Sequence, residues 1–486
     1  MKNNHHASCA PRFRVLSDAQ IKKLYQAALA CLKRTGVDVF NEEARDLLAS
    51  AGANVVGMRV RIKADIIHDC LSMAPRSFTI WGRDDTQRVR LEPNRVFFGP
   101  GPTCTHFMDP KTGKRRKARL GDPGTTARVC DALDNIDYVM SLGLIEGVTS
   151  SLASVYEFAE MITNTGKPVI PWAFNTNHLK DIYQMALAVT KSEDAFRRRP
   201  RFAFFSTYQA PLVHTDNDLA NCLWAVEHDI PVIYAGGELV GLTAPITGAG
   251  LLVIHLAATL SGLAILQLKK NGARICTGGV PVPIDLLSAR TAYGGPEMSL
   301  YSAAASEIYR YLKVPFIGTA GASDAKVMDL QAAIESTMQV IMSSLSAANM
   351  VHDIGFLDSA DIGSLEMLIL NDEIISLTKR VMRGIEVNDD TMMLDLIDQV
   401  GPGGEFITSE ETAKRCRLEI LNSKLMDRDP WPTWEKKGSS TMSDRIKERL
   451  HEILNNHTPL AMPKTAAEKI ANILEAAEVR EGYLKK

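Results

Sequence analysis

Five aromatic side chains stand where short apolar runs of this sequence end, although aromatic residues make up only 6% of its 486 residues. They are Phe98, Trp172, Tyr208, Tyr234 and Phe356. The faces of converging rings attract a desolvated cation, and quaternary ammonium is the ligand that suits them best. The alternative is that these rings only fill the end of a barrel. As a group, they favour a substrate cage for a quaternary amine.

Three polar residues are candidates for catalysis beside such a cage. Glu297 and Asp324 could face the ammonium end of a substrate, or could only orient loops. His352 ends an apolar run and is either a site residue or a packed core residue. It begins an H-x-x-G pattern, but Met350 stands where the cobalt-binding motif D-x-H-x-x-G has aspartate. We therefore predict that His352 is not a cobalt ligand.

Four glycines at the ends of apolar runs are candidates for contact with a large group. They are Gly236, Gly237, Gly278 and Gly321. Because glycine has no side chain, a ligand or a partner can approach the backbone closely there. Ordinary tight turns also need glycine, and this is the simpler explanation for each one alone. We expect the four together to contact a large ligand, such as a cofactor, or a partner.

Other kinds of site lack their motifs. The sequence has no P-loop, no G-x-S-x-G nucleophile elbow and no H-E-x-x-H, and no histidine is grouped with cysteine at ligand spacing. We therefore expect no metal site. The formal net charge of -2 argues against general binding of nucleic acid or of a membrane surface. The cysteines are scattered, which is typical of reduced thiols in the cytoplasm.

One stretch, residues 251–268, contains no charged residue and is just long enough to be considered as a membrane span. It ends at Lys269, Lys270 and the turn-forming pair Asn271-Gly272, and short strand-like runs flank it. These features favour a buried helix of a large α/β protein. The first residues, MKNNHHASCAPRF, contain no apolar segment typical of a secretory signal. We expect a soluble, cytoplasmic protein.

The scaffold that would position these residues is indicated by eight short apolar runs, which recur about every 30–42 residues with helical patterns between them. The runs begin at Val96, Tyr138, Pro168, Phe202, Pro231, Ala273, Pro315 and Met350. Alternating strands and helices predict parallel βα units, and eight units predict a (β/α)8 TIM barrel of the α/β class. A doubly wound sheet is the alternative, but no G-x-G-x-x-G follows the first run. Barrel sites lie at the carboxyl ends of the strands.

The segments on either side of the barrel have different patterns. Residues 1–92 are expected to form a helical region, with helices after Ser17 and Asn41 and a third over 63–73. The barrel should occupy residues 93–385. Residues 386–486 are loop-rich at first and then predict two terminal helices, beginning at Ser443 and Thr465. We expect these helices to pack on the barrel or on a neighbouring subunit.

Several longer segments, distributed over nearly the whole chain, form recognisable patterns. They are DPKTGKRRKARLGD (109–122), CDALDNIDYV (130–139), NTGKPVI (164–170), LTAPITGAG (242–250), GGPEMSLYSAAASEIYRYLKVP (294–315), SDAKVMDLQAAIE (323–335), NMVHDIGFLDSADIGSLEMLILNDEI (349–374) and VGPGGEFI (400–407). Each alone is weak. Together, in this order and at barrel spacing, they resemble the trimethylamine methyltransferase superfamily.

This resemblance implies a TIM barrel that demethylates a methylated amine and passes the methyl group to the corrinoid of a separate protein. The chain itself would bind no cofactor tightly. The founding members carry pyrrolysine, whereas this sequence has only standard residues and its SDAK segment continues through Lys326. Members without pyrrolysine are similar to enzymes that act on glycine betaine and other quaternary amines. The resemblance makes His352 the first choice for a substrate contact, but the histidine expected after GPGG is missing.

We therefore expect a methyltransferase that acts on a quaternary amine, with glycine betaine as substrate. Its partners would be a cognate corrinoid (cobalamin) protein and further copies of the chain. One alternative keeps this chemistry but takes proline betaine, carnitine, γ-butyrobetaine or choline. Another is a protein that binds quaternary ammonium solutes without catalysis.

Overall fold

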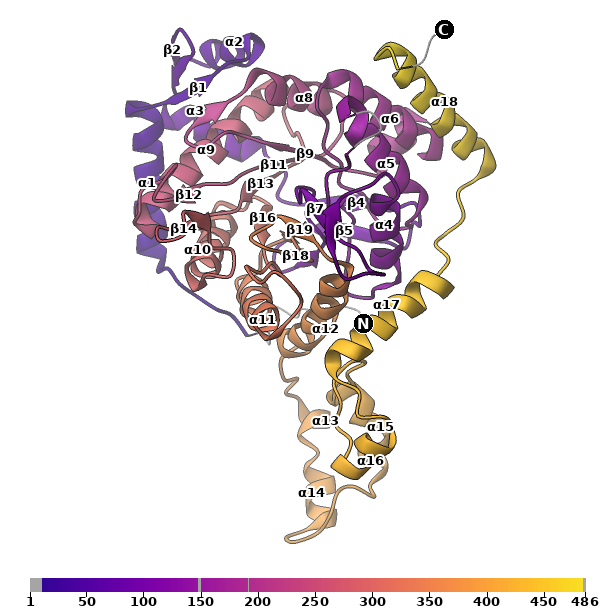
Figure 1. Ribbon diagram of the computed structural model, residues 1–486. Coiled ribbons are helices and arrows are strands. Elements are labelled where there is room, and N and C mark those ends of the chain that lie inside the picture. Colours follow the sequence, from indigo (N-terminus) through magenta and orange to yellow (C-terminus); the bar gives the residue numbers. More distant parts are fainter. Residues whose placement is uncertain (1–10, 147–149, 191, 484–486) are drawn as a thin grey trace.

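The computed structural model describes residues 11–146, 150–190 and 192–483. Its centre is a ring of parallel strands (Figure 1). Six of them are paired in the order β6 (Phe97–Phe98), β17 (Met350–His352), β16 (Phe316–Thr319), β13 (Ile275–Gly279), β11 (Val232–Gly236) and β9 (Phe204–Thr207). Single parallel bridges, Val139 with Val169 and Val169 with Phe202, supply the remaining two positions. The amide of Asp137 donates to the carbonyl of Phe98 at 2.7 Å and closes the ring.

A helix follows each of the eight strand positions, so the predicted (β/α)8 barrel is confirmed. These helices are α4 (Asp122–Ala132), α5 (Ala153–Thr163), α6 (Thr176–Thr190), α8 (Asp216–Glu227), α9 (Gly248–Lys269), α10 (Pro296–Leu312), α11 (Leu330–Leu345) and α12 (Leu365–Met382). A short helix, α7 (Glu193–Arg198), follows α6, and a 3-10 turn, η1 (Ser150–Leu152), precedes α5.

Helix α9 contains the long uncharged stretch. By length and composition it could cross a membrane, but most of its apolar window is buried inside the molecule. It packs against α1 (Asp18–Arg34), α3 (Ala64–Met73) and the strands β11 and β13. The prediction of a buried helix is therefore confirmed.

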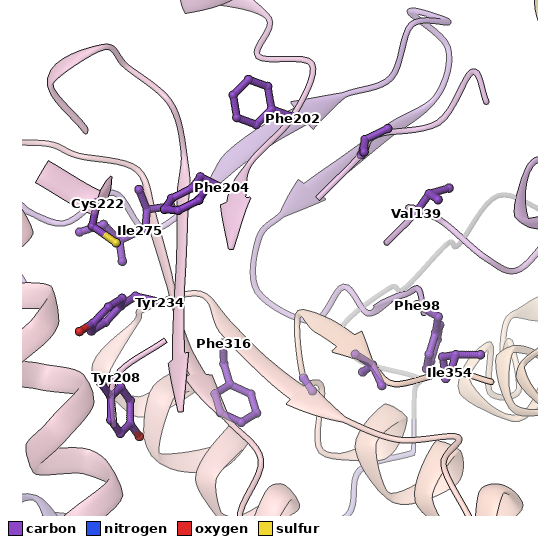
Figure 2. Packing of buried hydrophobic residues seen from close by; sticks show 14 of the residues in the cluster. Phe98, Val139, Phe202, Phe204, Tyr208, Cys222, Tyr234, Ile275, Phe316 and Ile354 are labelled. Atoms are coloured by element: carbon purple, nitrogen blue, oxygen red, sulfur yellow. The ribbon is translucent and has the colours of Figure 1, made fainter. Parts of the chain in front are cut away.

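Consecutive strand residues face two different apolar clusters. Phe97, Phe205, Ile233 and Met350 belong to a cluster inside the ring. Their neighbours, including Phe98, Phe204, Tyr234 and Phe316, belong to the large cluster between the strands and the helices (Figure 2). Both faces of each strand are buried, as in other parallel barrels. The parity of a residue within its strand therefore decides whether it can line the interior.

The amino-terminal region contains the three expected helices, α1, α2 (Glu42–Ser50) and α3, with side-chain caps from Ser17 and Asn41 on the first two. It also contains strands that the sequence analysis did not predict. Strands β1 (Val37–Val39), β2 (Asn54–Val56) and β3 (Arg59–Arg61) form a small sheet with β10 (Val213–His214).

A hairpin of β4 (Phe78–Trp81) and β5 (Arg88–Leu91) closes the amino-terminal end of the barrel. Its residues Phe78, Ile80, Val89 and Leu91 join the cluster inside the ring. The amide of Trp81 also donates to the carbonyl of Pro200, just before β9. The region before residue 92 therefore contributes to the barrel core and is not purely helical.

Two small sheets follow the carboxyl ends of the strands. One has the order β18 (Phe356–Leu357), β19 (Ile362–Gly363), β7 (His106–Met108) and β8 (Arg115–Lys117). The other contains β12 (Leu239–Val240), β14 (Val282–Asp285) and β15 (Arg290–Thr291). They surround the end of the barrel where a site is expected.

The carboxyl-terminal extension leaves the barrel and returns to it (Figure 1). Helices α13 (Asp389–Met392), α14 (Leu394–Val400), α15 (Glu410–Glu419) and α16 (Trp431–Lys436) form an arm that projects from the barrel. None of these four helices has a buried residue. The two terminal helices, α17 (Met442–Asn456) and α18 (Lys464–Arg480), then pack on α12 and α4 and on α6 and α5 respectively.

Candidate functional site

A cavity of about 500 Å³ opens at the carboxyl ends of the first four strand positions. Its wall is mostly apolar and includes the rings of Trp172, Phe174 and Phe205. Hydroxyl groups of Thr103 and Thr207 add polar contacts. A concave apolar site with a few polar groups, at this end of a barrel, is the usual setting for small-molecule chemistry.

The three rings of the cavity come from two neighbouring strand ends. Trp172 and Phe174 meet edge to face, with ring centroids 4.5 Å apart and an interplanar angle of 78°. Phe205 points into the barrel because it has the same parity as the interior residues. Of these rings, only Trp172 was singled out from the sequence. A cation within about 6 Å of such ring faces is stabilised by their quadrupoles.

The other aromatic residues predicted for the cage lie elsewhere. Phe98 and Tyr234 face the helices, and the Tyr234 hydroxyl lies 2.7 Å from Nδ1 of His214. Tyr208 is also packed in that outer cluster and donates to Glu238. Phe356 is fully buried in β18. These four rings are core residues, so their prediction as an open cage is corrected.

Behind Trp172 lies a buried carboxylate that the sequence analysis missed. Glu157 of α5 is 1% exposed, and its Oε2 accepts the indole N–H of Trp172 at 2.8 Å. Its Oε1 accepts the amide of Ile145 at 3.1 Å. Burial raises the pKa of Glu157 to about 7. The only signal in the sequence was a glutamate with apolar neighbours on both sides, in VYEFAEMI.

His352 lies inside the ring at the carboxyl end of β17. It is 4% exposed, and its ring centroid lies 6.1 Å from that of Phe205, which lines the cavity. Its Nδ1 is 2.5 Å from Oδ1 of Asp353, whose Oδ2 accepts the hydroxyl of Thr319. Within the described ranges, Nε2 of His352 is buried without a hydrogen-bond partner. This nitrogen is available to a bound molecule.

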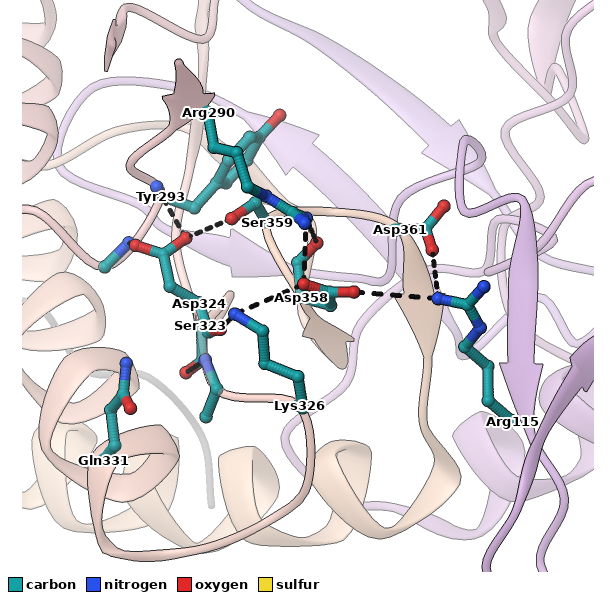
Figure 3. Close-up of polar contacts among 12 residues, drawn as sticks. Arg115, Arg290, Tyr293, Ser323, Asp324, Lys326, Gln331, Asp358, Ser359 and Asp361 are labelled. Atoms are coloured by element: carbon teal, nitrogen blue, oxygen red, sulfur yellow. Dashed lines mark hydrogen bonds and ion pairs between the residues drawn. The ribbon is translucent and has the colours of Figure 1, made fainter. Parts of the chain in front are cut away.

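The two acidic candidates do not reach the cavity wall. Asp324 accepts the amides of Tyr293 and Gly294 and the hydroxyl of Ser359, at 3.0, 2.9 and 2.6 Å (Figure 3). It therefore holds the loop before α10 against the loop after β18, which is the loop-orienting alternative. Glu297 is exposed in the first turn of α10.

Lys326 also points away from the cavity. Its Nζ donates to the carbonyl of Asp324 at 2.7 Å and lies 3.4 Å from Asp358 (Figure 3). The Asp358 carboxylate also pairs with Arg290 and Arg115. Lys326 thus belongs to a cationic cluster around one buried aspartate.

At three of the four predicted glycines, other residues of the chain already fill the space beside the backbone. A Cβ on Gly236 would lie 2.1 Å from the ring of Tyr208, and one on Gly278 would lie 2.2 Å from the carbonyl oxygen of Ile317. Gly321 has a φ of +74° and is packed against Ile354 and Asn371. These three serve internal packing. Gly237 is exposed, and a Cβ there would make only an ordinary contact, 3.7 Å from the carbonyl oxygen of Val280, so of the four this one fits the approach of an outside group.

The described residues contain no group of three or more His, Cys, Asp or Glu side chains placed to hold a metal ion. The cysteines in this part of the chain are free, and five of the seven are buried.

Comparison with known proteins identifies the family. The profile of the trimethylamine methyltransferase (MTTB) family matches residues 2–478. The chain is 28% identical to trimethylamine methyltransferase MttB of Desulfitobacterium hafniense (strain DSM 10664 / DCB-2), over 96% of this chain and 94% of that one. It is 27% identical to the glycine betaine methyltransferase of Desulfitobacterium hafniense (strain Y51), over 93% and 94%.

Among solved structures, the monomethylamine methyltransferase MtmB of Methanosarcina barkeri is similar, with a TM-score of 0.52 at 10% identity over 96% of this chain and 88% of that one. This likeness supports the barrel architecture alone. The match of the family profile to almost the whole sequence shows that the chain belongs to the trimethylamine methyltransferase family.

Proposed function

We propose that this protein transfers a methyl group from a quaternary amine, glycine betaine first among them, to the Co(I) corrinoid of a separate protein. The observation that carries the proposal is the cavity walled by Trp172, Phe174 and Phe205 at the carboxyl ends of the strands. Support for the reaction class comes from relatives named as trimethylamine and glycine betaine methyltransferases.

The rings would hold the trimethylammonium group and exclude water from it. Cation–π contact orients the substrate more than it stabilises the transition state, because the positive charge leaves the nitrogen as the methyl departs. A betaine carboxylate needs donors, and the cavity offers Thr103, Thr207 and Lys117. Lys117 lies at the rim and pairs with Glu146 at 2.6 Å. This arrangement can fix both ends of a short zwitterion.

The proposed step breaks one C–N bond and forms one C–Co bond. The nitrogen keeps the electron pair of the broken bond and leaves as a neutral tertiary amine. No proton is needed, because a quaternary ammonium is already a good leaving group. The protein would therefore act by positioning and by its fixed charges.

We propose that His352 contacts the substrate or the methyl acceptor from inside the barrel. Its Nδ1 is held by Asp353, so its Nε2 presents a fixed direction to the interior. Glu297 and Asp324 would act only by shaping loops around the entrance. The exposed backbone at Gly237, on the strand end next to the cavity, fits the approach of a corrinoid carried by a partner.

We also propose that copies of the chain associate through the projecting arm, in the cytoplasm. The arm presents large apolar side chains to solvent, including Leu394, Ile407 and Leu418. Exposed apolar surface of this kind is typical of protein interfaces.

Methyl transfer to free cobalamin tests this function. Co(I) cobalamin would be incubated with the protein and, separately, glycine betaine, proline betaine, carnitine, γ-butyrobetaine, choline or trimethylamine. The spectrum of methylcobalamin with glycine betaine, and its loss in His352→Ala, is the expected result. Formation of methylcobalamin with another compound in place of glycine betaine would identify that compound as the substrate. Tight binding without methyl transfer would instead support a non-catalytic binder.

A further inference from the structure

We propose that Glu157 is a positioning residue of the cavity: it orients the indole of Trp172 and supplies the negative charge that balances a bound cation. This inference rests on the proposed function for the nature of the ligand. It concerns a residue on helix α5, away from the strand ends.

The geometry ties Glu157 directly to the cavity. The indole N–H of Trp172 and the amide of Ile145 donate to its carboxylate, and both residues line the cavity. The hydroxyl of Ser141 is a further hydrogen-bond partner of this carboxylate. The indole is therefore fixed at one edge by Glu157 and packed against Phe174. Loss of the carboxylate would free the ring to turn about its side-chain bonds.

The carboxylate of Glu157 also lacks a cationic partner in the described part of the chain. Within the described ranges, no Lys, Arg or His nitrogen lies within 4.0 Å of Glu157 in the way that pairs other acidic residues here. A buried carboxylate without a cation is costly to ionise. Burial accordingly raises the pKa of Glu157 to about 7, so its protonated and ionised forms coexist near neutral pH.

A permanent cation in the cavity would change this balance. It attracts the ionised form of Glu157 and not the protonated form, so binding of the cation and loss of the proton favour each other. Ligand affinity should therefore rise with pH through about 7 and level off above it. A ligand of the same shape that lacks the cationic nitrogen should show no such dependence.

Other titratable groups surround this region, and their titration must be distinguished from that of Glu157. On the elements packed against α5 they include Asp122, Arg128 and Asp131 of α4, His178, Lys180 and Asp181 of α6, and Glu478, Arg480 and Glu481 around α18. Around the cavity they are Asp218, Lys117 and Glu146. Asp122 pairs with Arg116, Asp131 with His457, and Glu478 with Tyr156. Burial lowers the pKa of His178, which keeps that ring neutral at pH 7.

Asp218 is the strongest competitor. It lines the cavity, and burial raises its pKa, although the hydroxyl of Thr215 donates to it at 2.6 Å. It makes no contact with Trp172 among the hydrogen bonds of the described residues. Observation of Trp172 itself therefore distinguishes the two carboxylates.

The first measurement needs no ligand. The indole N–H of Trp172 would be followed by 1H–15N NMR from pH 5 to pH 9 and assigned with Trp172→Phe. Its resonance should titrate with a midpoint near 7 in the natural protein, as expected for its hydrogen bond to Glu157, and should not titrate in Glu157→Gln. Titration that persists in Glu157→Gln would overturn the proposal. This readout holds whether or not glycine betaine is the substrate.

The second measurement is calorimetry with glycine betaine in buffers of different ionisation enthalpy. At pH 7 the natural protein should release about half a proton per ligand bound, and its affinity should fall by up to about tenfold from pH 8 to pH 6. Glu157→Gln should release none and bind about tenfold more weakly at pH 8. The analogue 3,3-dimethylbutanoate has the same shape and the same carboxylate but an uncharged carbon in place of the ammonium nitrogen, and it should bind without proton release.

Glu160→Gln is the matched control. Glu160 lies on the same helix, and burial also raises its pKa, but its carboxylate faces Gly124 of α4. Glu160→Gln should show the same titration of the Trp172 indole and the same proton release as the natural protein. If Glu157→Gln folds poorly, Glu157→Asp is the second variant. It keeps the carboxylate, so proton release on binding should persist. If glycine betaine does not bind to the natural protein while the indole resonance still titrates, the substrate proposal fails and the role of Glu157 in holding Trp172 stands.

Discussion

At the scale of single residues, the cavity depends on which way each side chain points from its strand. Phe204 and Phe205 are adjacent in sequence, yet Phe204 packs under the helices and Phe205 lines the cavity. A sequence pattern of alternating polar and apolar residues would reveal this parity, but parallel barrel strands are apolar on both faces. Strand ends, and Trp172 at one of them, were therefore predictable, whereas the inward direction of Phe205 was not.

Trp172 should dominate recognition of the cation. We expect Trp172→Ala to weaken binding of glycine betaine by about tenfold, since a desolvated cation–π contact contributes about 1–2 kcal/mol. Isothermal calorimetry measures the change. Trp81→Phe is the control, because Trp81 lies at the opposite end of the barrel, where Arg88 and Arg199 stack on it at 5.1 and 5.0 Å. Equal losses in both variants would contradict the assignment.

Glu157 should also affect stability in a pH-dependent manner. Its pKa in the folded protein, about 7, is above the ordinary value of 4.5, so the native state holds the proton more tightly than the unfolded state. Stability from this group is complete below the unfolded value and is lost as pH rises toward 7. Relative to Glu157→Gln, the natural protein should lose up to about 3 kcal/mol of unfolding free energy between pH 5 and pH 8. Urea unfolding at several pH values measures it, and a constant difference would contradict it.

At the scale of elements, the positions of the helices and strands followed from the sequence with good accuracy. The expected terminal helices begin within one residue of Ser443 and Thr465, and Ser17 and Asn41 cap the helices expected after them. Short strands were harder to recognise. The hairpin strands FTIW and RVRL lie in a region that reads as helical, and they become strands by packing into the barrel. Tertiary contacts decided their structure.

Lys167 fixes the junction between α4 and the second strand position. Its ammonium is buried and donates to the carbonyls of Cys130, Leu133 and Ile136, each at 2.6 Å. Lys167→Met would leave three buried carbonyls without this donor, so we expect a loss of at least about 3 kcal/mol in unfolding free energy. Chemical denaturation followed by circular dichroism tests this. Lys180→Met, at an exposed position of α6, should change stability little.

At the scale of the whole molecule, the barrel was predictable because eight apolar runs recur at regular spacing, and the family because its segments occur in order. The projecting arm was not predictable. Its segment has ordinary helix caps, such as Asn388 and Ser409. Only the structure shows that its helices project away from the barrel (Figure 1). Nothing in the local pattern shows that these helices lack a core of their own.

The arm should mediate self-association. We expect the natural protein to form an oligomer, since helices that bury no side chain of their own gain stability by packing against another surface. Leu394→Asp combined with Ile407→Asp should shift the mass toward the monomer in size-exclusion chromatography with light scattering. Asp398→Asn, which leaves the apolar residues in place, is the control. A natural protein that is monomeric at high concentration would contradict this prediction.

The hairpin of β4 and β5 closes the amino-terminal end of the barrel. A ligand must therefore enter from the opposite end, where the cavity opens at the carboxyl ends of the strands. If the proposed chemistry is correct, the methyl donor has to arrive first, and the cobalt-bearing partner then covers this opening. The demethylated amine would remain trapped until that partner leaves, so turnover should slow when the partner is present in large excess.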